Sequence, residues 1–163
     1  MPDEYDLLIY AKNGHRLELL EHLDEVFPRH IQIHYGQNKR EQLFEAARRS
    51  RACAYLADDD HGPLALQEIL LAGCPTVGVR TGASFVRTGE TGVVVDRLPP
   101  GRQCAESDDD VRALAVLMEA IEEAQSLDRQ SVRQRTAVDF GSRKIMDSVV
   151  KSLDTVRSDD SLA

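Results

Sequence analysis

The sequence predicts an α/β protein built on a doubly wound parallel sheet, with a helical extension at its C-terminal end. Two observations carry this prediction. Short apolar runs alternate along the chain with amphipathic stretches of helical spacing, which is typical of a parallel sheet covered on both faces. Most of the apolar runs are nearly continuous, as expected of strands that are buried on both faces.

The first half of the chain contains three predicted strands and two predicted helices. Residues 5–10 form an apolar run that ends near an Asn-Gly pair. Leucines then recur at helical spacing over residues 17–27, until a proline closes the helix. Residues 31–35 are a second strand, ended by a glycine, and the apolar residues at 43–47 mark a second helix. Residues 52–56 complete this part as a third strand.

The second half adds two strands joined by a loop. A proline suits the first turn of a helix over residues 63–72, and a glycine stops that helix. Residues 76–79 follow as a fourth strand. A glycine-rich loop from Thr81 to Gly89 then leads to a fifth strand at residues 92–95.

The chain beyond residue 100 is predicted to be helical. Ser107 is expected to cap a long helix reaching about residue 127, with three aspartates in its first turn, where negative charge favours the helix dipole. Breaks near Asp128 and Gly141 separate two more helices. We expect residues 1–157 to form a single domain and residues 158–163 to be a flexible tail.

Composition and charge narrow the range of partners. The chain has 163 residues, and its 28 acidic against 20 basic side chains give a net charge of −8, which disfavours nucleic acids and anionic membranes. No apolar run approaches the roughly 20 residues needed to span a bilayer, and the acidic N-terminus is no signal peptide. Cys53, Cys74 and Cys104 lack metal-binding spacing, so we expect reduced thiols in a cytoplasmic protein.

Four loops are expected at the carboxyl edge of the sheet, where open α/β sheets bind their ligands. In chain order they carry Lys12 and Arg16, Tyr35 and Gly36, residues 58–62, and residues 81–84. A helix N-terminus offers free backbone N–H groups to an anion, and the first loop adds two positive charges. This combination indicates a site for a small phosphorylated ligand.

The segment that follows the third strand carries a more specific pattern. Asp60 and Glu68 stand eight positions apart across a predicted helix start, and the helix ends in Gly73-Cys74-Pro75 directly before a strand. This pattern resembles the C-terminal, donor-binding half of retaining glycosyltransferases with the two-domain GT-B architecture, of the glycosyltransferase group 1 or family 4 type. In that family an acid, seven residues and a glutamate precede Ala-x-Gly-x-Pro-Val.

Flanking segments extend the resemblance. Residues 49–56 are similar to the family's helix end in Ser-x-Ala before an apolar strand. Residues 81–86 and 89–95 look like its glycine-rich loop and its Gly-x-Thr-Gly strand, and residues 137–140 look like its C-terminal stretch. The resemblance covers about residues 5–156 and implies a Rossmann-like GT-B half.

The resemblance implies three catalytic residues. Glu68 would accept hydrogen bonds from the ribose hydroxyls of a nucleotide-sugar, since a carboxylate is a two-pronged acceptor for a cis-diol. Asp60 would face the donor sugar, and Lys12 would pair with the departing diphosphate and stabilise its charge. The donor would be a nucleoside diphosphate sugar, and no cofactor or metal would be required.

Further donor-binding residues follow from the same resemblance. Arg16 would add a second cation at the diphosphate, and Tyr35 and Gly36 would lie near the base. Gly62 and Leu64 would contact the sugar or phosphate through the backbone. The remaining contacts would come from the glycine-rich loop, at Thr81, Gly82, Ala83 and Ser84.

The sequence departs from the family pattern in four ways, one of which is that Thr81 replaces a glycine of the loop. Asp60 stands where the family usually has a glutamate, Ser84 replaces the glutamate of the loop, and the acceptor-binding domain is absent from this sequence. We therefore expect sugar transfer only together with a separate chain that supplies the acceptor domain. The alternative is a non-catalytic nucleotide- or nucleotide-sugar-binding module, or a homodimeric interaction module, derived from a glycosyltransferase.

The run of aspartates from Asp58 to Asp60 leaves two other interpretations open. It can be a solvated loop that ends a strand, or an Asp-x-Asp metal site as in the other glycosyltransferase architecture. A phospho-receiver domain also has an aspartate after its third strand. That class is excluded because it needs an acidic pair after the first strand, where this chain has Ala11-Lys12-Asn13.

Overall fold

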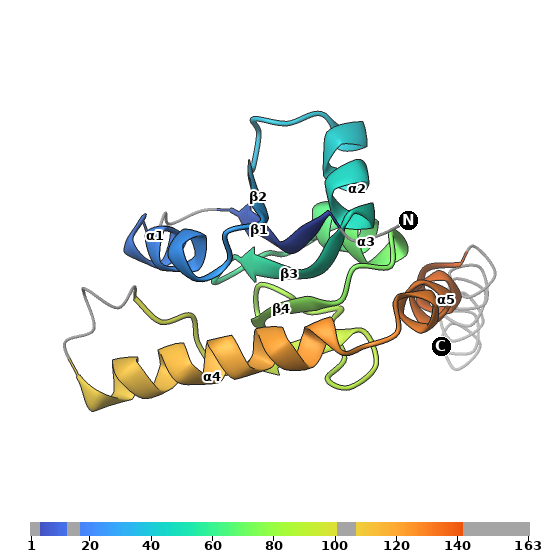
Figure 1. Cartoon of the computed structure of the whole chain (residues 1–163). Helices are drawn as coiled ribbons and strands as arrows, with labels where there is room; N and C mark the ends of the chain where they lie inside the picture. Colours follow the sequence, from blue (N-terminus) through green and yellow to red (C-terminus); the bar gives the residue numbers. More distant parts are fainter. Residues whose placement is uncertain (1–3, 13–16, 101–106, 142–163) are drawn as a thin grey trace, which may run out of the picture.

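A computed structural model describes residues 4–12, 17–100 and 107–141 of the chain (Figure 1). These residues form a five-stranded sheet in which every pairing is parallel, with the strand order β2-β1-β3-β4-β5. The strands are β1 (Tyr5–Ala11), β2 (His30–His34), β3 (Ser50–Leu56), β4 (Thr76–Val79) and β5 (Gly92–Val95). The helices are α1 (Leu17–Val26), α2 (Arg40–Arg48), α3 (Leu64–Leu71), α4 (Asp108–Gln125) and α5 (Arg129–Phe140). The predicted α/β class and doubly wound parallel sheet are confirmed.

Helices cover both faces of the sheet. Successive residues of β1 show the division, because Leu7 and Ile9 belong to a core cluster with α1 and α4, whereas Leu8 and Tyr10 belong to a second cluster with α2 and α3. Figure 1 shows α4 running along one side of the sheet and α2 and α3 on the other. A strand buried on both sides needs apolar residues at consecutive positions, which explains the continuous apolar run of β1.

The predicted C-terminal extension is an integral layer of the domain. α4 packs on β3, β4 and β5, and the chain then crosses to the opposite face, where α5 packs on α3 (Figure 1). The predicted cap and break are present: the Ser107 Oγ accepts a hydrogen bond from the Asp110 N–H at 3.2 Å, and the Asp128 carboxylate accepts one from the Ser131 N–H at 2.8 Å. The third predicted helix, beyond Gly141, and the tail at 158–163 lie outside the described residues.

Arg129 ties α5 to the end of α2 and the start of β3. Its Nη1 donates to the Ser50 carbonyl at 2.6 Å, and its Nη2 donates to the carbonyls of Ala47 at 3.0 Å and Arg48 at 2.8 Å. Gly73, at φ +81°, lies so close that a Cβ there would be 2.8 Å from the Arg129 carbonyl oxygen. One guanidinium thus supplies donors to two carbonyls at the end of α2 and one at the start of β3. This set of Arg129 contacts, called the anchor below, lies where β3 begins, at the edge of the sheet opposite the carboxyl ends of the strands.

Two features of the described residues bear on the cysteines and on membranes. Cys53 and Cys74 are buried and are not joined by a disulfide bond, and Cys104 lies outside the described residues. Burial raises the pKa of the Cys53 thiol well above its usual value, which keeps it protonated and unreactive. None of the described helices combines the length and the apolar character that a membrane crossing needs.

Candidate functional site

The candidate site lies at the carboxyl edge of the sheet, where the strand order reverses. The chain runs from β1 outward to β2 and then returns past β1 to β3. Ligands of doubly wound sheets bind at such a switch point. Lys12 directly follows β1, and its N–H donates to the Leu56 carbonyl, the last residue of β3, at 3.0 Å. The loops after β1 and β3 therefore leave the sheet side by side.

Lys12 and Asp60 meet at this switch point. The Lys12 Nζ lies 2.6 Å from the Asp60 Oδ1, and the Tyr55 hydroxyl donates to the Asp60 Oδ2 at 2.7 Å. The Asp60 side chain is 4% exposed and that of Lys12 is 17% exposed. Each carboxylate oxygen thus has its own donor, one of them charged, as a buried carboxylate requires. The sequence predicted both charged residues, and the structure brings them into contact with each other.

Tyr35 adds an exposed aromatic ring to the same corner. The Lys12 Nζ lies 4.9 Å from the centre of the Tyr35 ring, a cation–π contact that fixes the ammonium on its second side. The Tyr35 N–H donates to the Ala11 carbonyl at 2.9 Å, which places the ring next to the end of β1. Gly36 follows at φ +79°, a left-handed conformation that glycine adopts without strain. The ring is 60% exposed and free to stack against a planar ligand.

Two buried tyrosines below the ion pair escaped the sequence analysis. The rings of Tyr10 and Tyr55 stack with centres 5.1 Å apart. Burial, followed by the negative charge of Asp60, raises the pKa of Tyr10 to about 12. Burial, followed by the hydrogen bond to Asp60, raises the pKa of Tyr55 far above its usual value. Both residues occur inside apolar runs, so their pattern indicates core strands and gives no sign of a polar role.

Alkaline pH should destabilise the protein through these tyrosines. The unfolded chain releases the Tyr10 proton near pH 10, whereas the folded chain holds it until about pH 12. The contribution of Tyr10 to the free energy of unfolding is therefore complete below pH 10 and declines as the pH rises to 12. Between pH 8 and pH 12, the free energy of unfolding of Tyr10→Phe should therefore fall by about 2 kcal/mol less than that of the parent. Urea unfolding at a series of pH values measures this difference. Tyr5→Phe, at the opposite edge of the sheet, is the control, and an equal effect of both variants would contradict this assignment.

Glu68 lies in α3 and pairs with a residue that the sequence analysis did not single out. The Arg40 Nε contacts the Glu68 Oε1, joining the first residue of α2 to the second turn of α3. Glu68 is 17% exposed and Arg40 is 78% exposed, so the arginine reaches in from solvent. α3 packs on the face of the sheet that holds Tyr10 and Tyr55, so Glu68 and Asp60 belong to the same side of the sheet.

The glycine-rich loop is fastened to the loop that carries Asp60. The Asp60 N–H donates to the Thr81 carbonyl at 3.0 Å, and the Thr81 Oγ1 donates to the Asp58 carbonyl at 2.5 Å. Gly82 passes so near the backbone that a Cβ there would lie 1.8 Å from the Ala57 carbonyl oxygen. Ala83 is fully buried, its N–H donates to the Val79 carbonyl and its carbonyl accepts from the Val86 N–H, so the expected contact of Ala83 with a ligand is not found in this arrangement. The two loops therefore form one fixed wall beside the ion pair.

A cavity of about 330 Å³ opens in this wall. It is lined by Asp59, Asp60, His61, Gly62, Pro63, Arg80, Thr81, Ser84 and Phe85. Gly62 borders open space, with nothing within 4 Å of the position that a Cβ would take. Leu64 begins α3 and is exposed. Arg16 lies outside the described residues, so the structure does not place its side chain relative to this cavity.

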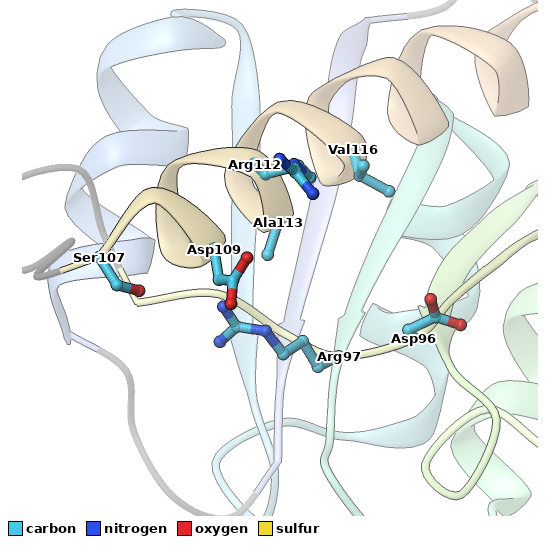
Figure 2. Close-up of a pocket in the computed structure, with 7 residues that line it drawn as sticks. All are labelled: Asp96, Arg97, Ser107, Asp109, Arg112, Ala113 and Val116. Carbon is cyan, nitrogen blue, oxygen red and sulfur yellow. The ribbon is translucent and has the colours of Figure 1, made fainter.

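A larger hollow of about 520 Å³ lies elsewhere, between the end of β5 and the start of α4 (Figure 2). Its lining residues are Asp96, Arg97, Ser107, Asp109, Arg112, Ala113 and Val116. Arg97 is engaged there by Asp110, with the Nη2 2.7 Å from the Oδ1. None of the residues singled out from the sequence as ligand-binding or catalytic lines this hollow.

The described residues contain no group of three or more His, Cys, Asp or Glu side chains arranged to hold a metal ion. The aspartate run is engaged in other ways. Asp60 accepts from Lys12 and Tyr55, and the Asp59 Oδ2 lies 3.2 Å from the His61 Nε2. The Asp-x-Asp interpretation therefore has no support from the geometry of this loop.

Comparisons with known proteins bear on the fold. No protein-family model matches the chain, and no curated protein matches it in sequence. One similar structure is AviGT4, described as a glycosyltransferase involved in avilamycin A biosynthesis. Its sequence is 16% identical to this chain, the match covers 91% of this chain and 50% of AviGT4, and the TM-score is 0.49.

The pneumococcal O-GlcNAc transferase GtfA, solved in complex with UDP and GlcNAc, is similar over more of the chain. It is 12% identical, with a TM-score of 0.57, and the match covers 95% of this chain and 36% of GtfA. The chain thus spans half or less of both proteins. At this identity the likeness concerns architecture, and it shows that the chain has the α/β fold of part of a glycosyltransferase.

Proposed function

We propose that the chain binds a nucleotide-sugar at the carboxyl edge of its sheet, as the donor-binding part of a glycosyltransferase. The observation that carries the proposal is the Lys12 ammonium, held between Asp60 and the exposed Tyr35 ring at the point where the strand order reverses. A cation fixed at a switch point suits a diphosphate. The fold shared with GtfA, whose structure holds UDP and GlcNAc, makes UDP-sugars the first probes.

Lys12 would bind the diphosphate. An ammonium has three N–H donors, and Asp60 takes one of them, which leaves two for phosphate oxygens. Because Asp60 and Tyr35 already hold the side chain, little conformational entropy is lost when a ligand binds. The same charge would stabilise the diphosphate as it leaves the sugar. Asp60, whose two oxygens both have donors, would act mainly by positioning Lys12.

Tyr35 and Glu68 would hold the nucleoside. The exposed Tyr35 ring offers a stacking surface for the base, and the Glu68 carboxylate offers acceptors for the ribose hydroxyls. Arg40 contacts one oxygen of that carboxylate and comes from solvent, so it can move aside or share the carboxylate with the ribose.

The decisive test is binding of UDP and UDP-glucose to the chain and to Glu68→Ala. We expect roughly 10- to 100-fold weaker binding by the variant, because it loses hydrogen bonds to a charged acceptor. The free energy of unfolding should change by less than about 1 kcal/mol, since the Arg40 partner is exposed. Isothermal titration calorimetry measures the first quantity and urea unfolding measures the second.

Glu122→Ala is the matched control for this test. Glu122 is an exposed glutamate of α4, on the opposite face of the sheet. The Glu122→Ala variant should bind UDP-glucose with the same dissociation constant as the parent. If Glu68→Ala also binds as the parent does, Glu68 has no part in the nucleotide site.

Turnover is a separate question from binding. In the two-chain hypothesis, an acceptor-domain chain completes the enzyme, and sugar transfer appears only when both chains are mixed. Two observations favour the alternative of a binding module without turnover: both Asp60 oxygens are occupied, and Ser84 stands where the resemblance expects an acid. UDP release from UDP-glucose, with and without candidate acceptor-domain chains, distinguishes the two. A homodimer would show as a concentration-dependent mass in sedimentation equilibrium.

A further inference from the structure

The cavity between the loops after β3 and β4 has an unusual balance of donors and acceptors. Its acidic side chains are engaged within the protein. Asp60 accepts from Lys12 and Tyr55, one donor on each oxygen. Asp59 pairs with His61, with 3.2 Å between the Oδ2 and the Nε2. Both acidic side chains of the lining therefore have partners within the protein, and the buried one, Asp60, is paired with a cation.

The β4 side of the cavity offers donors instead. Arg80 lines the cavity and is exposed, and no acid among the residues that the structure describes pairs with its guanidinium. Ser84, also exposed in the lining, has a hydroxyl with no partner in the described part of the chain. The exposed arginines Arg97 and Arg135 each pair with an acid. Arg80 thus combines an exposed guanidinium that no described acid pairs with and a place in the lining of this cavity.

Arg80 is also held in position by its backbone. It is the first residue after β4, and the N–H groups of Gly82 and Ala83 both donate to the Val79 carbonyl, at 3.1 and 2.6 Å. This tight turn cannot shift freely, because Gly82 already lies against Ala57. The backbone of Arg80 is therefore held in place at the rim of the cavity.

We propose that this cavity takes the sugar of the donor and that Arg80 selects a sugar that carries a carboxylate, as a uronic acid does. The inference rests on the proposed function, because the cavity adjoins Asp60 and thus the site assigned to the diphosphate. A volume of about 330 Å³ lies at the small end of the range for ligand sites and suits a single sugar ring. The planar guanidinium matches a carboxylate with two parallel hydrogen bonds, and the Ser84 hydroxyl adds a third donor.

The experiment compares UDP, UDP-glucose and UDP-glucuronate, which differ only by the sugar and its carboxylate. Dissociation constants are measured by calorimetry for the parent chain, Arg80→Gln and Arg80→Lys. We expect the parent to bind UDP-glucuronate about 10-fold more tightly than UDP-glucose. Arg80→Gln should abolish this preference, Arg80→Lys should retain part of it, and binding of UDP should stay within about twofold in both variants.

Arg112→Gln is the matched control, because Arg112 is an exposed arginine at the other hollow, on α4 (Figure 2). It removes the same charge and should leave the preference unchanged. A parent that binds both UDP-sugars equally overturns the inference, as does a preference that survives in Arg80→Gln. If UDP binds while the preference is absent, the proposed nucleotide site stands and the carboxylate assignment fails. If UDP and both UDP-sugars fail to bind, the proposed function fails and the inference falls with it.

Discussion

Gly82→Ala is expected to lower the free energy of unfolding by about 3 kcal/mol. A Cβ at this position would lie 1.8 Å from the Ala57 carbonyl oxygen and 2.7 Å from the Ala57 carbonyl carbon. The obstacle is backbone, so relief requires the loops after β3 and β4 to separate. That movement would also break the hydrogen bond from the Asp60 N–H to the Thr81 carbonyl. Urea unfolding at neutral pH measures the loss.

Gly62→Ala is the control for this prediction. The substitution is the same and Gly62 lies in the loop that Gly82 packs against, but a Cβ at Gly62 meets nothing within 4 Å. Its stability should stay within about 0.5 kcal/mol of the parent. Equal stability losses in the two variants would show that close backbone approach is not what requires glycine at position 82.

Lys12→Met is expected to have the second largest effect, on stability and binding together. The substitution leaves the buried Asp60 carboxylate with Tyr55 as its remaining donor. Breaking a buried ion pair by removing one partner costs about 3 kcal/mol. Binding of UDP-glucose should weaken roughly 100-fold, because the proposed diphosphate cation is gone. Urea unfolding and calorimetry on the same preparation measure the two losses.

A double-mutant cycle measures how much of the stability lost in Lys12→Met comes from the ion pair with Asp60. Asp60→Asn keeps the shape of the side chain and removes the charge that pairs with Lys12. The double variant, Lys12→Met with Asp60→Asn, should be about 1 to 3 kcal/mol more stable than the sum of the single effects predicts. Additive effects would show that the 2.6 Å contact contributes no coupling. Unchanged UDP-glucose binding by Lys12→Met would remove Lys12 from the proposed site.

The fold could be predicted because its signals are local. The buried strands are short apolar runs ended by glycine or polar residues, and Ser107 and Asp128 cap their helices through contacts three residues away. What local pattern could not show is the side of the sheet on which each helix lies. α4 was expected as an extension, yet it covers β3, β4 and β5, and this arrangement depends on contacts far apart in sequence.

The candidate site could be predicted in its members but not in its pairings. Lys12, Asp60 and Glu68 were singled out as groups that act on a ligand, whereas the structure pairs Lys12 with Asp60 and Glu68 with Arg40. The first pair joins residues 48 positions apart and exists because β1 and β3 are neighbours. Tyr55 was hidden for another reason, since its hydroxyl reaches Asp60 only because the chain folds back after β3.

The anchor formed by Arg129 has a consequence for the order in which the chain can be completed during its synthesis. The five described strands all precede residue 129, so a ribosome has synthesised this sheet before α5 exists. Until then the carbonyls at the junction of α2 and β3 lack their guanidinium, and the outer side of α3 lacks the helix that packs on it. The growing chain therefore passes through an interval in which this apolar side is open to chaperones and proteases, and that interval ends only when α5 emerges.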